Sequence, residues 1–259
     1  MLSKKRNFLA VLCYFNICFI WGTNNLVTRI GVSTMSPLQF SGMRFLTAGI
    51  VLSLIALIKK EPVKFTRQEY KNLFFIGGVM FFLTNGCVVY GNKLVDSGIV
   101  TVLLSTIPIF TTLLGMIFLK DEKPGISTFL GLIFGFLGIV IVALWGNGSI
   151  KLNPVGVIIT LAASAFWSFG SIYSQNLVVN GSAITQTAVE ALFASVLLLG
   201  TAIITKNFSF GTITKEAIFP ILYLAVVDSV VAFLSYGFLL KAWPISKVCT
   251  YAYINPIVA

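Results

Sequence analysis

The stretch Gly146-Asn147-Gly148-Ser149-Ile150-Lys151-Leu152-Asn153-Pro154 divides this chain into two halves of one design. Apolar segments of helix length lie on both sides of it, and the second series repeats the first. Residues separated by 146 positions often share an uncommon type, and after Ala242-Trp243 the separation grows by two. The pairs are Asn7 with Asn153, Trp21 with Trp167, Ala48 with Ala194, Tyr90 with Tyr236, Gly91 with Gly237, and, past the insertion, Pro108 with Pro256.

The composition is that of a polytopic membrane protein. The 259 residues are 57% hydrophobic and 10% charged, with a mean hydropathy of +0.96. Ordinary soluble domains are about 45–50% apolar and about 25% charged. The net charge of +10 does not indicate nucleic-acid binding, because the Lys and Arg residues lie between apolar spans and form no single basic face.

The sequence predicts neither a metal site nor a cofactor. It contains no His, which excludes a His-based metal site or an imidazole acid or base. Its four cysteines fall inside apolar spans without CxxC spacing, and small packing residues are typical of that pattern: Cys13, Cys18, Cys87 and Cys249. A nucleotide-binding Gly-rich motif followed by Lys and Ser or Thr is also absent.

The hydropathy pattern predicts an all-α membrane helix bundle. Two repeats are expected, at 8–145 and 154–259, each built from transmembrane helices. The predicted spans are 8–31, 38–58, 70–92, 97–119, 126–145, 154–178, 184–204 and 218–240, with a ninth beginning near 247. Five helices per half is an odd number, so the second half enters the membrane from the opposite side and the repeat is inverted.

The protein is expected in the cell membrane, and the distribution of its cations predicts that the N-terminus lies in the cytoplasm. Twelve cations then lie inside: Lys4, Lys5, Arg6, Lys59, Lys60, Lys64, Arg67, Lys71, Lys120, Lys123, Lys241 and Lys247. Five lie outside: Arg29, Lys93, Lys151, Lys206 and Lys215. This excess of cations on one side follows the positive-inside rule.

Polar and aromatic residues recur at matched depths in the two halves. The first helix carries Trp21, Asn24 and Asn25, and the first helix of the second half carries Trp167 and Ser171. Such groups need partners inside a membrane, either through hydrogen bonds between helices or in a hydrated cavity. The matched positions favour a substrate cavity, to which the pair Tyr90 and Tyr236 is also assigned, with Trp21 and Trp167 facing one another.

Three ionisable residues lie inside predicted spans: Arg44, Glu190 and Asp228. Arg44 and Glu190 occupy equivalent positions of the two halves, and inversion places them near opposite membrane faces. Asp228 is therefore the better partner for Arg44 or for a proton. If transport is coupled to protons, we expect Glu190 or Asp228 to carry them. Alternatively, Arg44 reaches the headgroups and Glu190 makes interfacial hydrogen bonds.

Prolines and glycines predict where helices bend and where they pack closely. Pro108 and Pro256 are expected to kink equivalent helices and to take part in gating, although a kink used only for packing is the alternative. The glycines of the fifth helix form a face that permits close helix approach: Gly131, Gly135 and Gly138.

The chain resembles the EamA family of drug/metabolite transporters. The residues that carry the resemblance are Phe19-Ile20-Trp21-Gly22-Thr23-Asn24, Met43-Arg44-Phe45-Leu46, Pro108, Leu119-Lys120-Asp121-Glu122, the glycines of the fifth helix and Tyr253-Ile254-Asn255-Pro256. The resemblance implies ten helices in two inverted repeats, a central cavity, and a carrier that exports small metabolites such as amino acids.

Three functions are compatible with a helix bundle of this kind to different degrees. A secondary transporter working by alternating access between the halves is expected, as a monomer or homodimer with a small-molecule substrate. A membrane enzyme is not expected, because the only two-acid cluster is Asp121-Glu122 in a short basic loop. A non-transporting or lipid-handling membrane subunit of the same fold is the alternative.

The repeat also predicts a continuation of the second half. The first half runs 145 − 108 = 37 residues past Pro108, whereas the sequence given runs three residues past Pro256. We expect a further helix, beside the glycine face of the fifth helix, to stabilise the protein.

Overall fold

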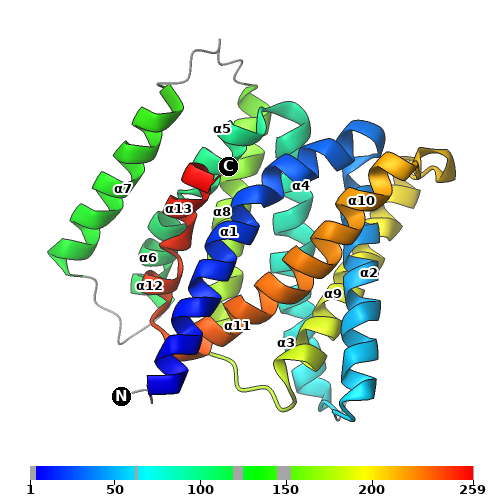
Figure 1. Cartoon of the computed structure of the whole chain (residues 1–259), viewed down its shortest axis with the longest axis horizontal. Coiled ribbons are helices and arrows are strands. Elements are labelled where there is room, and N and C mark those ends of the chain that lie inside the picture. Colours follow the sequence, from blue (N-terminus) through cyan, green and yellow to red (C-terminus); the bar gives the residue numbers. More distant parts are fainter. Residues whose placement is uncertain (1–3, 62–63, 119–124, 145–152, 259) are drawn as a thin grey trace.

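The structure is a computed structural model of the chain, and it describes residues 4–61, 64–118, 125–144 and 153–258. Within these ranges every regular element is helical (Figure 1). The elements are α1 (Lys4–Thr34), α2 (Pro37–Ile58), α3 (Arg67–Ile76), η1 (Gly77–Thr84), α4 (Asn85–Leu94), α5 (Ser97–Leu104), α6 (Ile107–Phe118), α7 (Ile126–Leu144), α8 (Pro154–Gln175), α9 (Ala183–Ile204), η2 (Phe210–Thr212), α10 (Lys215–Tyr223), η3 (Leu224–Ala232), α11 (Phe233–Ala242), α12 (Ile245–Val248) and α13 (Tyr251–Val258).

Seven helical segments of the described chain are long and apolar enough to cross a membrane. They are Lys5–Thr34, Pro37–Ile58, Arg67–Leu94, Ser97–Phe118, Pro154–Gln175, Ala183–Ile204 and Lys215–Ala242. These agree with seven of the predicted spans to within a few residues, and the remaining two predicted spans correspond to α7 and to α12 with α13. The chain is a multi-pass membrane protein. The central linker 145–152 and the pair Asp121-Glu122 lie outside the described residues.

Local sequence explains where several helices begin. Ser36 and Asn153 precede α2 and α8, accept hydrogen bonds from backbone N–H groups of the first turn, and are each followed by a proline at the first helical position. At α3 the side chain of Thr66 accepts from the Glu69 N–H, and the Glu69 carboxylate accepts from the Thr66 N–H. Asn7, which matches Asn153 in the repeat, instead lies inside α1, which begins three residues earlier.

The two halves end their second helix in the same way. Lys60, just after α2, and Lys206, just after α9, have positive φ angles of 53° and 56°, and 60 + 146 = 206. The following N–H groups, of Glu61 and Asn207, bond back to Ala56 and Ala202 at 2.9 and 2.8 Å. This left-handed closure satisfies carbonyls that the end of a helix leaves free.

The third helix of each half contains a π-helical segment. These segments are η1 (Gly77–Thr84) and η3 (Leu224–Ala232), and moving η1 by 146 positions gives 223–230. In η1 the wider backbone turn is supported by Thr84 and Asn85, whose side chains donate to carbonyls five residues earlier, at 3.0 Å each. Long π-helical stretches are rare and often lie at functional sites.

The buried apolar side chains of the described helices form one large aromatic and aliphatic cluster and two smaller ones. Helices α2 and α9 lie side by side, and α1 packs along α11, η3 and α13 (Figure 1). Helix α7 lies at the edge of the bundle and contacts α5 and α13. A Cβ placed on Gly131 of this helix would meet no atom within 4 Å. The surroundings of Gly135 and Gly138 are outside the described part of the chain.

The two prolines differ in their local structure. Pro108 is buried at the second position of α6, directly after a break in the span at 105–106, so the predicted interruption is present. Pro256 lies inside α13, and the break in that segment, at 249–250, precedes the proline by more than a turn. The two interruptions therefore do not coincide under the repeat. Gating by either proline stays a prediction.

Candidate functional site: a charged cavity between the halves

A cavity of about 80 Å³ lies between the helices of the two halves. Its lining comes from α1, α2, η1, α4, α5, α6, α8, η3, α11 and α13. At this size it has room for several water molecules. The lining residues are Trp21, Asn24, Asn25, Arg44, Thr84, Asn85, Val88, Thr101, Leu104, Ile107, Trp167, Asp228, Phe233, Tyr251, Ala252 and Asn255.

A buried ion pair forms one wall of this cavity. The Arg44 guanidinium, 2% exposed, donates to the carboxylate of Asp228, which is fully buried. Its Nε donates to the Ser229 hydroxyl at 3.0 Å, and the Asn24 side-chain amide donates to Asp228 at 2.6 Å. The geometry thus pairs Arg44 with Asp228, as the sequence predicted, and buries both side chains inside the helix bundle.

An amide cluster forms the neighbouring wall. Asn25 donates to the Thr101 hydroxyl at 2.9 Å and accepts from the Asn92 side chain at 3.1 Å. Asn92 also donates to the Val88 carbonyl at 3.0 Å, and Asn25 and Asn92 are both buried. These bonds join α1 to α4 and α5, so the polar residues of α1 both line the cavity and form hydrogen bonds between helices.

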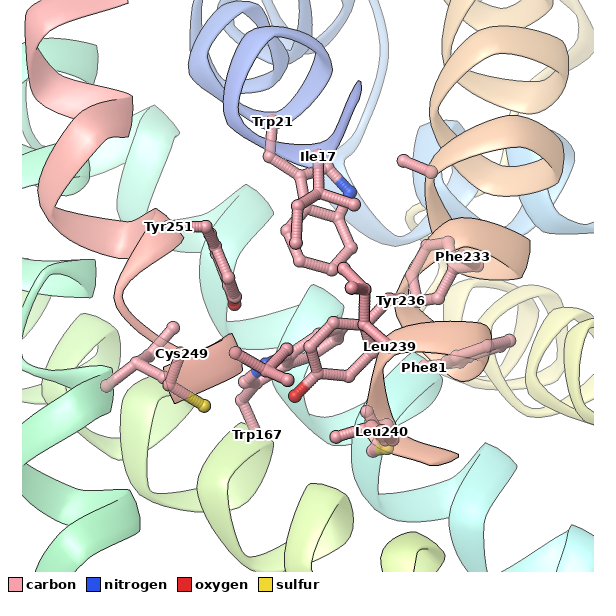
Figure 2. Close-up of a cluster of buried hydrophobic side chains, with 14 of the residues drawn as sticks. Ile17, Trp21, Phe81, Trp167, Phe233, Tyr236, Leu239, Leu240, Cys249 and Tyr251 are labelled. Carbon is pink, nitrogen blue, oxygen red and sulfur yellow. The ribbon is translucent and has the colours of Figure 1, made fainter. Parts of the chain in front are cut away.

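Aromatic side chains from several helices meet beside the cavity (Figure 2). The Trp21 ring of α1 and the Trp167 ring of α8 meet edge to face, with centroids 5.2 Å apart. Tyr236 lies 5.2 Å from each of them. Phe233 lies 5.8 Å from each tryptophan, and its ring is 4.4 Å from that of Phe81. We call Trp21, Phe81, Trp167, Phe233 and Tyr236 the aromatic layer.

The residues assigned to the cavity from sequence divide into two groups. Trp21, Asn24, Asn25 and Trp167 line it. Tyr236 belongs to the aromatic layer and its hydroxyl donates to Ser171 at 2.7 Å, and neither residue lines the cavity. Tyr90 is half-buried against the apolar core and is not among the lining residues. Their roles in binding stay predictions.

Glu190 lies away from Arg44, as inversion predicts. It is 8% exposed and lines a second cavity, on the other side of the aromatic layer, together with Tyr236 and Lys241. Within the described part of the chain, Arg44 forms its ion pair with Asp228, and no Lys or Arg nitrogen lies within 4.0 Å of the Glu190 carboxylate.

Comparison with known proteins identifies the family. The sequence profile of the EamA-like transporter family matches residues 8–144 and 154–259. The chain belongs to the EamA-like transporter family. The resemblance seen in the sequence is thereby confirmed, and the protein is a membrane transporter of this family.

Relatives of this transporter carry transporter names. An uncharacterized inner membrane transporter, YedA of Escherichia coli (strain K12), is 32% identical over 247 residues, which are 95% of this chain and 78% of that protein. A probable amino-acid metabolite efflux pump of Salmonella typhimurium is 26% identical and is aligned with 99% of this chain and 85% of its own. A crystal structure with 18% identity superposes with a TM-score of 0.74, over 96% of this chain and 85% of that one. This last similarity concerns the fold alone.

Several lining residues of this EamA-like transporter were not predicted. Thr84, Asn85 and Thr101 are polar residues inside apolar spans, which is the signal that drew attention to Asn24 and Asn25. Phe233 and Tyr251 carried no such signal, because an aromatic residue in an apolar helix is usually part of the core. Their place at the cavity depends on how α11 and α13 pack against the other helices that line it.

Proposed function

We propose that this EamA-like transporter exports a small zwitterionic or amphiphilic metabolite, such as an amino acid, by alternating access. The observation that carries the proposal is the Arg44–Asp228 pair on the cavity wall. A cation and an anion that are buried side by side can exchange partners with a substrate that carries both charges. The guanidinium then takes the substrate carboxylate, the Asp228 carboxylate takes its ammonium group, and no charge is left uncompensated.

The aromatic lining suits an amphiphilic side chain. Trp21, Trp167, Phe233 and Tyr251 offer apolar faces beside the ion pair. The name of the Salmonella relative, a probable amino-acid metabolite efflux pump, agrees with this class of substrate. With room for a few waters in this conformation, the cavity has to widen when a metabolite enters, as alternating access requires.

Alternating access draws support from the two halves. Duplication of one ancestral unit accounts for two matched features of the halves. These are the left-handed residues Lys60 and Lys206 and the π-helical segments η1 and η3. If the first half crosses the membrane five times, as the hydropathy pattern predicts, the second half begins on the opposite side and the two copies have opposite orientations in the membrane. Two inverted halves can move against each other between two conformations, and this movement opens a central site first to one side of the membrane and then to the other.

We place the N-terminus and the loop around Lys64 in the cytoplasm, following the cation bias. Lys64 is exposed in the structure, so a cysteine at this position can react with a maleimide. In intact cells, an impermeant maleimide should leave a Lys64→Cys variant unlabelled until the membrane is permeabilised. Rapid labelling from outside would refute this orientation.

The transport assay uses purified protein in liposomes with a panel of radiolabelled amino acids and amphiphilic amines, with and without a pH gradient. We expect saturable uptake of at least one zwitterion, and its loss in Arg44→Gln. If protons drive transport, Glu190→Gln should abolish the response to the gradient but keep substrate exchange measurable. Asp228→Asn should lose the exchange as well, because this carboxylate also binds the substrate. The charged and titratable neighbours are Arg44 at Asp228, and Lys241 and Tyr236 at Glu190. Uptake equal to that of protein-free liposomes for the whole panel would contradict the proposed function.

A further inference from the structure

A second polar cavity, of about 60 Å³, lies on the far side of the aromatic layer from the ion pair. Its lining includes Glu190, Gln186 and Thr187 of α9, Ser174 of α8, and Tyr236 and Lys241 of α11. We call it the inner cavity. Phe233 lines both cavities, so its ring lies between them.

Glu190 is the unusual group of the inner cavity. Its side chain is more than nine-tenths buried, and the hydrogen bonds found across the described chain include none to its carboxylate. The nearby amide of Gln186 is already used, because it donates to the Val179 and Gly181 carbonyls at 3.1 Å each. Lys241 acts on Glu190 electrostatically from beyond 4.0 Å. A buried carboxylate without a close partner is costly, and a ligand that supplies one removes that cost.

The surroundings of Glu190 favour an organic cation. The rings of Phe81, Phe233 and Tyr236 line the same space, and aromatic faces attract ammonium groups. The hydroxyls of Ser174 and Thr187 can accept hydrogen bonds from an ammonium N–H. Lys241 is exposed and belongs to the last turn of α11, so its side chain can turn toward solvent when a cation arrives.

We propose that the inner cavity is a second binding site, separate from the Arg44–Asp228 cavity, which takes the ammonium group of an amine against the Glu190 carboxylate. This proposal rests on the proposed transport function only where it places the inner cavity on the route that the substrate takes. Binding to it can be measured without any transport.

The test is equilibrium binding of radiolabelled 2-phenylethylamine to the purified protein in lipid nanodiscs. We expect saturable binding that unlabelled amine displaces and that the neutral analogue 2-phenylethanol displaces poorly. Glu190→Gln should weaken binding by about tenfold or more, since a charge-assisted hydrogen bond is lost. Lys241→Met should strengthen binding, because it removes the cation that competes for the same carboxylate.

Three further variants act as controls. Glu216→Gln makes the same substitution at an exposed position at the start of α10 and should change binding by about twofold or less. Glu190→Asp keeps the charge and should retain amine binding that Glu190→Gln loses. Arg44→Gln, in the other cavity, should leave amine binding unchanged while it abolishes uptake of the zwitterion.

The outcomes separate the two proposals. Absence of saturable binding in the wild-type protein, equal binding in Glu190→Gln, or weaker binding in Lys241→Met would each overturn the inner site. Normal amine binding in a protein that moves no substrate would count against transport alone and would leave the inner site in place.

Discussion

Arg44 shows how one buried charge organises its neighbours. Three helical segments meet through it, because its partners Asp228 and Ser229 lie on η3, and Asp228 in turn accepts from Asn24 of α1. Its guanidinium carbon also lies 4.8 Å from the centre of the Phe45 ring. Every charge of the cluster is compensated inside the protein.

Removing one charge of this pair should cost more than removing both. Arg44→Gln leaves the Asp228 carboxylate buried without its cation, and Asp228→Asn does the reverse, at about 3–5 kcal/mol each. The double variant replaces the pair by two neutral amides and should lose less stability than the sum of the single variants. Thermal unfolding midpoints in nanodiscs provide the measurement. Additive shifts would contradict the coupling.

The sequence predicts that Arg44 pairs with Asp228, but it does not predict the geometry of their contact. Rare ionisable residues inside apolar spans identify Arg44, Asp228 and Glu190, because burying charge is costly unless it serves a purpose. Inversion of the halves then separates Arg44 from Glu190. The hydrogen bond from Asn24 to Asp228 could not be predicted, because it depends on the rotation of α1 about its axis.

The π-helical segments are the main finding at the scale of elements. Each occupies the middle of a span that hydropathy predicts as one continuous helix, 70–92 in one half and 218–240 in the other. Periodicity of apolar residues does not distinguish an α-turn from a π-turn when all faces are apolar. The end of η1 places Thr84 at the cavity, the first residue of α4 is Asn85 beside it, and η3 places Asp228 there.

A pair of adjacent glycines tests the packing of η1. A Cβ on Gly77 would lie 2.8 Å from the backbone oxygen of Glu190 and 3.1 Å from its Cα, and a helix backbone cannot easily yield. A Cβ on Gly78 would meet its nearest atom, on Phe193, at 3.9 Å. Gly77→Ala should therefore destabilise the protein by about 1–3 kcal/mol.

Gly78→Ala is the matched control and should be neutral or stabilising by up to about 1 kcal/mol, since alanine favours helices. When both variants are measured in the same nanodiscs, the thermal unfolding midpoint of Gly77→Ala should be lower than that of Gly78→Ala. Equal midpoints would show that η1 and α9 do not approach as closely as the structure indicates.

At the scale of the whole molecule, the sequence predicted most of the fold. The duplication, the class and seven spans follow from hydropathy and from pairs such as Trp21 with Trp167. The position of α7 at the edge of the bundle did not follow, because its glycines indicated close packing whereas Gly131 faces open space. A small-residue spacing permits close approach but does not say which helix approaches.

The central claim is that the two halves form a carrier with one site exposed alternately to each side. Solute counterflow tests it most directly: liposomes are loaded with an unlabelled zwitterion from the transport panel and diluted into a trace of the labelled compound. A carrier predicts transient accumulation of label above its equilibrium level, because inward and outward movement share one site, and the overshoot should vanish in Arg44→Gln. Monotonic equilibration without an overshoot, identical in wild type and Arg44→Gln, would contradict the account.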